Sequence, residues 1–151
     1  MRAHGNTPGP TQRPLLTGAI AGGLAAMPSV MLLYYFGALE SIARFFGINL
    51  WLVILSVAAL LTLAGTIYAA IFKRAANDCE GGWLFGAGYG FLLWMIAPIS
   101  LWQLIAAQPI VVGRAAMSLF AAHLLYGLAL GIVFPHIHWL VQIKLSDAPK
   151  S

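Results

Sequence analysis

Four long apolar runs constrain the fold of this chain more than any other feature of its sequence. They cover residues 15–39, 48–72, 83–107 and 115–135, and continuation of the fourth run past Pro135 is left open. Each holds about 20 to 25 residues, which lets an α-helix cross roughly 30 Å of hydrocarbon at about 1.5 Å per residue. Because backbone groups in lipid must be hydrogen-bonded within their own segment, the runs predict an all-α membrane protein with four transmembrane helices.

The sequence outside the runs defines the ends of this domain. Residues 1–14 are polar and contain several Pro and Gly residues, which predicts a disordered cytoplasmic N-terminus. The four-helix transmembrane domain is expected over residues 15–145, followed by a C-terminal tail at 146–151.

The charge content favours a chain whose main partner is the lipid bilayer. Only 8% of the residues are charged, whereas a soluble domain carries about 25%. The basic residues form no run interleaved with aromatic residues, so no nucleic-acid partner is expected. The acidic residues all lie outside the apolar runs: Glu40, Asp78, Glu80 and Asp147. We therefore predict no catalytic residues, no metal site and no enzymatic activity, because intramembrane chemistry usually needs charged groups within the spans.

The basic residues predict the orientation of the helices. Two of them, Arg44 and Arg114, fall on one side of the membrane. The other six fall on the opposite side: Arg2, Arg13, Lys73, Arg74, Lys144 and Lys150. Cytoplasmic loops carry the excess of Lys and Arg, so both termini are expected in the cytoplasm.

The first outer loop predicts a short helix at the membrane surface. Within residues 39–50, Glu40 and Arg44 are four apart, so one helical turn can pair their charges. Phe45 and Phe46 would then dip into the lipid, as expected of an interfacial amphipathic helix.

Glycines recur at a spacing of four and suggest both helix packing and an internal repeat. We predict that six of them line helix contacts: Gly18, Gly22, Gly86, Gly90, Gly127 and Gly131. Small residues matter here because helices in lipid associate through close backbone approach. Gly18 and Gly22 recur 68 residues later as Gly86 and Gly90. This pattern favours two tandem helical hairpins, although helix packing alone can select the same residues.

His123 is the one histidine deep within an apolar run, and three roles are open to it. It shares a helix face with Gly127 and Gly131, so it is expected to point into the bundle near the middle of the membrane. The favoured interpretation is a neutral histidine hydrogen-bonded to a neighbouring helix through Tyr34, Tyr35, Tyr68 or Tyr89. Alternatively, His123 binds haem or a pigment together with Met27 or Met95, or it handles protons or a substrate.

The other two histidines of this region, His136 and His138, follow Pro135. We expect both to be solvated at the cytoplasmic interface rather than to bind a metal.

Three stretches resemble small uncharacterised bacterial inner-membrane proteins of the YagU-like kind. They are GAIAGGLAAMP at residues 18–28, GWLFGAGYG at 82–90 and HLLYGLALGIVF at 123–134. The resemblance implies a four-helix membrane fold in the bacterial cytoplasmic membrane, and it carries over no active-site residue.

The function expected from these observations is that of an accessory or structural subunit. Little polar surface and many small-residue faces favour packing against other membrane proteins, such as a respiratory or photosynthetic complex. The alternatives are a small channel or transporter lined by the two hairpins, and a haem- or pigment-binding protein through His123.

Overall fold

The structure is a computed structural model that describes residues 13–72, 81–101 and 114–146, and every element in these ranges is helical. The all-α prediction is therefore confirmed for the described part of the chain. In chain order the elements are α1 (Pro14–Tyr35), α2 (Ala38–Phe46), α3 (Leu50–Phe72), α4 (Gly82–Trp94), the π-helix η2 (Met95–Leu101) and α6 (Arg114–Ser146).

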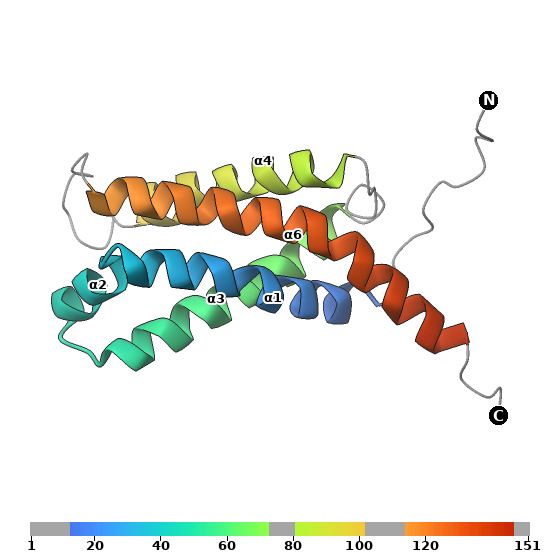
Figure 1. Cartoon of the computed structure of the whole chain (residues 1–151), viewed down its shortest axis with the longest axis horizontal. Helices are drawn as coiled ribbons and strands as arrows, with labels where there is room; N and C mark the ends of the chain where they lie inside the picture. Colours follow the sequence, from blue (N-terminus) through green and yellow to red (C-terminus); the bar gives the residue numbers. More distant parts are fainter. Residues whose placement is uncertain (1–12, 73–80, 102–113, 147–151) are drawn as a thin grey trace.

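The long helices form two antiparallel hairpins (Figure 1). The first hairpin is α1 packed along α3, the second is α4 packed along α6, and α1 also packs along α6 to join them. The start of α1 and the end of α6 lie toward one end of the bundle, whereas α2 lies at the other end (Figure 1). The helices therefore alternate in direction along the chain.

Three helical segments are long and apolar enough to cross a membrane: Pro14–Tyr35, Leu50–Phe72 and Ala116–Val141. The predicted run 83–107 contains a shorter apolar helix, Gly82–Pro98, and residues 102–107 lie outside the described ranges. The described helices thus support a membrane protein with three clear spans and a shorter fourth apolar helix.

Two predicted boundaries are wrong. The first run does not continue to residue 39, because α1 ends at Tyr35 and Gly37 adopts a left-handed conformation with φ of 71°. That conformation, which glycine tolerates best, separates α1 from α2. The start of the tail is also wrong, because α6 continues past Pro135, as the sequence allowed, to Ser146, which was assigned to the tail. A proline inside an apolar helix is tolerated when neighbouring groups compensate for its missing N–H.

Another proline changes the helix type where α4 continues into η2. Pro98 lies inside η2, the π-helical continuation of α4. Because proline has no backbone N–H, the regular α-helical bond to the residue four positions earlier cannot form. A π-helical turn uses bonds that span one more residue and accommodates the break.

Glycine makes the backbones within each hairpin nearly touch. A Cβ atom added at Gly18 would lie 2.6 Å from the carbonyl oxygen of Gly65, and one added at Gly22 would lie 2.9 Å from the Gly65 Cα. In the second hairpin, a Cβ at Gly86 would lie 2.8 Å from the Gly131 Cα and would also meet the carbonyl oxygen of Gly127. A Cβ at Gly90 would meet the carbonyl oxygen of His123. All six glycines named from the sequence therefore lie at helix contacts.

The contacts repeat in the same register in both hairpins. Gly18 and Gly22 both approach Gly65 in the first hairpin, as Gly86 and Gly90 both approach Gly127 in the second. The repeat of glycines in the sequence is thus matched by a repeat of contacts in space.

Gly86→Ala is expected to lower the free energy of unfolding by about 1–3 kcal/mol, which is the typical cost of overpacking. The new methyl carbon would meet main-chain atoms of Gly127 and Gly131, which cannot move aside as a flexible side chain can. The measurement is unfolding by SDS in mixed micelles, followed by tryptophan fluorescence.

Gly88→Ala is the matched control on the same helix. A Cβ at Gly88 meets nothing within 4 Å, and replacing glycine by alanine in a helix stabilises it by about 0.5–1 kcal/mol. Equal stabilities of the two variants would contradict the contact geometry described above.

Candidate functional site

An aromatic cluster fills the interior where the two hairpins meet. The ring of Tyr68 lies 5.1 Å from that of Tyr89 and 5.7 Å from that of Phe134, measured between ring centroids. Tyr68, Tyr126 and Phe134 are completely buried. Large rings from α3, α4 and α6 therefore occupy the space that a central path would need.

Two tyrosines of the second hairpin donate hydrogen bonds to the first. The Tyr126 hydroxyl donates to the carbonyl oxygen of Leu61 at 2.6 Å, and the Tyr89 hydroxyl donates to that of Ala64 at 2.7 Å. Both acceptors lie near the middle of α3. The buried hydroxyl of Tyr68 has no hydrogen-bond partner among the described residues. The hydroxyl groups thus tie α4 and α6 to α3, which shares few direct backbone contacts with them.

The predicted partner of His123 is wrong. Its Nδ1 is 2.7 Å from the carbonyl oxygen of Leu119, one turn earlier in the same helix. Tyr34 and Tyr35 are exposed, and the hydroxyl of Tyr89 is bonded to α3 instead. Because a carbonyl can only accept, Nδ1 carries the proton and Nε2 carries the lone pair. Of the four tyrosines named from the sequence, only Tyr68 and Tyr89 are buried, and Tyr126 was not predicted.

His123 is half-buried in the bundle, so its predicted place near the middle of the membrane, pointing into the bundle, stays a prediction. His123 lies about 4.5 Å before Tyr126 along the helix axis. The Tyr126 hydroxyl donates to Leu61, the central residue of α3. Of the two methionines proposed to face His123, Met27 is 61% exposed on α1 and Met95 is 40% exposed in η2. Both methionines are thus more exposed than a ligand enclosed in the interior would be, and Gly90 packs directly against the His123 main chain. The described residues include no group of three His, Cys, Asp or Glu side chains able to hold a metal ion.

The two later histidines have different environments, so the expectation that both are solvated is half wrong. His136 is exposed, and its Nδ1 is 2.8 Å from the carbonyl oxygen of Ile132. His138 is buried, with only 6% of its surface exposed. The difference arises because α6 stays helical past Pro135, so residues two apart point to nearly opposite sides.

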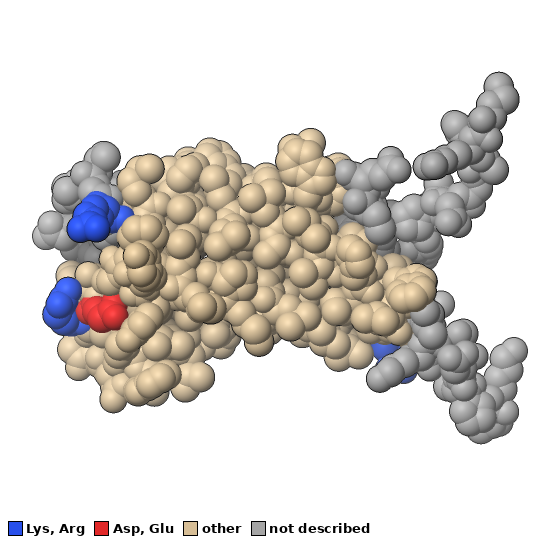
Figure 2. Space-filling view, viewed as in Figure 1, with Lys and Arg blue, Asp and Glu red and all other residues tan. Residues whose placement is uncertain are grey.

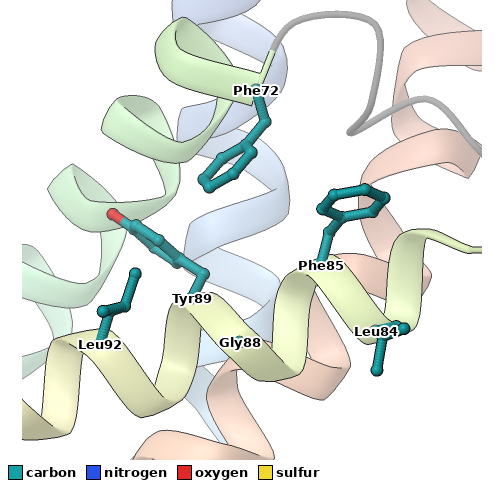
Figure 3. Close-up of a pocket in the computed structure, with 6 residues that line it drawn as sticks. All are labelled: Phe72, Leu84, Phe85, Gly88, Tyr89 and Leu92. Atoms are coloured by element: carbon teal, nitrogen blue, oxygen red, sulfur yellow. The ribbon is translucent and has the colours of Figure 1, made fainter.

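An apolar groove of about 380 Å³ separates the end of α3 from α4 (Figure 3). Its walls include the aromatic rings of Phe72, Phe85 and Tyr89, and Gly88 leaves part of the α4 surface without a side chain (Figure 3). The Tyr89 hydroxyl already donates to Ala64. The groove therefore offers an apolar surface and no group for acid–base or nucleophilic chemistry.

A second pocket, of about 450 Å³, lies beside α2 and contains the charged groups of this region. Its lining residues are Glu40, Ala43, Arg44, Gly47, Ile48 and Leu50. Acidic and basic side chains lie next to each other at this end of the molecule (Figure 2).

The ion pair predicted between Glu40 and Arg44 is not formed. The Arg44 guanidinium donates instead to the hydroxyl of Ser41 at 3.4 Å, and Glu40 Oε2 is buried with no hydrogen-bond partner. A spacing of four residues permits the pair but does not fix the rotamer of a long arginine side chain.

Comparisons with known proteins identify no relative of this chain. No protein-family model matches the chain, and neither the curated proteins nor the solved structures include a match. The resemblance to YagU-like proteins stays a prediction.

Tyr126→Phe is expected to lower the free energy of unfolding by about 1 kcal/mol, because it removes a buried hydrogen bond between the hairpins. The bond to the Leu61 carbonyl is short and fully enclosed. SDS unfolding in mixed micelles measures the change.

Tyr68→Phe is the matched control, since the same atom is removed from an equally buried ring whose hydroxyl has no partner. This variant is expected to be at least as stable as the natural protein, because an unpartnered buried hydroxyl is itself unfavourable. A loss as large as that of Tyr126→Phe would contradict the assignment of the hydrogen bonds.

Proposed function

We propose that the protein is a non-catalytic accessory subunit of the membrane, which packs against other membrane proteins through its outer helix faces. The observation that carries this proposal is the contrast between a filled interior and an outer surface of large apolar side chains. The proposal includes four transmembrane helices, with α4 and η2 forming the third.

The α3 helix offers the best surface for a partner. In the most apolar stretch of α3, only 22% of the residues are buried. The corresponding stretches of α1 and α6 are each 39% buried. Its exposed side chains follow most of its length: Trp51, Leu52, Leu55, Leu60, Leu63, Ile67 and Ile71. A face this apolar requires either lipid or another protein to cover it.

The interior gives less support to a channel or transporter. Tyr68, Tyr126, Leu130 and Phe134 are fully buried at the centre of the described bundle, and the two pockets described above lie at its periphery. A path between the hairpins would require these side chains to move apart.

The alternative of a haem or pigment ligand rests on the free lone pair of His123 Nε2. A ligating histidine commonly donates its other ring N–H to a carbonyl, as His123 does to Leu119. Tight packing of Gly90 against His123 and the exposure of Met27 favour a structural role over this alternative.

For the location we propose the bacterial cytoplasmic membrane, with both termini in the cytoplasm. The distribution of basic residues supports this orientation, because Arg44 and Arg114 alone belong to the predicted outer loops. The arrangement of the helices is compatible with it, since α2 and the start of α6 lie at the same end of the bundle (Figure 1).

A photo-crosslinking residue at Leu63 is expected to form a discrete adduct with a different membrane protein, because this side chain is 55% exposed on α3. Extraction in a mild detergent should then yield a large complex of fixed stoichiometry that contains the adduct. The readout is the mass of the adduct and of the complex.

Ala64 supplies the matched control, because it is the next residue along the helix and only 8% exposed. The same crosslinker there should give no adduct with another protein. A lone, monodisperse protein with no adduct from Leu63 would refute the proposed packing role.

Reporter fusions test the orientation. A fluorescent protein fused after Ser151 should fluoresce and alkaline phosphatase fused there should be inactive, because the first requires the cytoplasm and the second requires export. Alkaline phosphatase inserted after Gly47, in the predicted outer loop, should be active. The reverse pattern would show that the orientation is inverted.

A further inference from the structure

The pocket beside α2 has the form of an open site between two elements. It lies where the chain turns from α2 into α3, and Gly47 at this turn has a φ of 64°. A Cβ added at Gly47 would meet nothing within 4 Å, so no neighbouring group fills this part of the pocket.

The pocket contains one acidic and one basic side chain whose charges are not paired with each other. Glu40 Oε2 is buried without a hydrogen-bond partner. A buried carboxylate oxygen in this state lacks the donor that would offset its desolvation. Arg44 is exposed, and its contact to Ser41 at 3.4 Å is longer than a strong hydrogen bond. The guanidinium therefore retains donors for an anionic oxygen.

The pocket lies at an end of the bundle, and this position favours a ligand that belongs to the membrane surface. It lies at the end of the bundle where α2 connects two apolar helices, and Trp51 in the first turn of α3 is 71% exposed. Exposed tryptophans favour the headgroup region of a bilayer. If α1 and α3 span the membrane, the pocket lies at the level of the lipid headgroups.

We propose that this pocket binds the headgroup of a zwitterionic phospholipid with a primary ammonium, of which phosphatidylethanolamine is the common example. Arg44 binds the phosphate, for which a guanidinium is well shaped. The ammonium donates to the carboxylate of Glu40. The charge pattern of the pocket thus complements that of the headgroup.

The same geometry predicts selectivity among phospholipids that share the phosphate group. Phosphatidylcholine carries a quaternary ammonium that has no N–H, so it cannot donate a hydrogen bond to the Glu40 carboxylate that lines the pocket. Phosphatidylglycerol has the phosphate but no cation. The inference rests on the membrane-spanning part of the proposed function and is independent of whether a partner protein exists.

The test is native mass spectrometry of the isolated full-length chain in a neutral detergent, with each lipid added at equal concentration and with identical acyl chains. Phosphatidylethanolamine is expected to bind about tenfold more tightly than phosphatidylcholine or phosphatidylglycerol, as a charge-assisted hydrogen bond suggests. Equal binding of phosphatidylethanolamine and either other lipid overturns the proposal, and this comparison needs no variant.

Glu40→Gln should remove most of the preference, and Glu80→Gln, the same substitution in the connection from α3 to α4, should keep it. An equal loss in both variants overturns the assignment to Glu40. Soluble phosphoethanolamine at the same concentration should not displace the lipid, because it lacks acyl chains; displacement overturns the membrane as the source. Because no other protein is present, absence of the proposed complex would not affect these results.

Discussion

Close contact between backbones at glycine is the constraint on which the rest of this structure depends. Lipid supplies no hydrophobic force between helices, so two helices associate through what their surfaces offer each other. In the first hairpin, Gly18 and Gly22 approach Gly65, and the second hairpin repeats this register around Gly127. Because the glycines fix which helix faces turn inward, they also decide which side chains form the aromatic cluster and which remain on the outer surface.

The aromatic cluster adds a second level of organisation. The tyrosine hydroxyls reach main-chain acceptors on α3 that the glycine contacts leave within range. The interior is thus both dense and largely satisfied in its hydrogen bonds, which suits a protein whose surface, rather than whose core, interacts with other molecules. The charged pocket beside α2 lies apart from this core, so binding there need not disturb the packing of the hairpins.

Hydropathy located the start of α1 and both ends of α3 closely, and the glycine spacing identified the residues at the helix contacts. The break at Gly37 was missed because one glycine within an apolar run leaves its hydropathy unchanged. The partners of Tyr89 and Tyr126 lie 25 and 65 residues away in the chain, so no local pattern specifies them. The environment of His138 was misjudged because both histidines after Pro135 were assigned to the interface, whereas α6 stays helical there and turns His138 inward.

The direction of the tyrosine hydrogen bonds makes the dependence between the two hairpins one-sided. The acceptors on α3 are helix carbonyls that already receive an amide from their own helix, so the first hairpin does not need the second to satisfy them. The donors, Tyr89 and Tyr126, find these partners only after the second hairpin has docked. The main-chain hydrogen bonds of α3 are therefore independent of the second hairpin, whereas the hydroxyls of Tyr89 and Tyr126 depend on contact with the first.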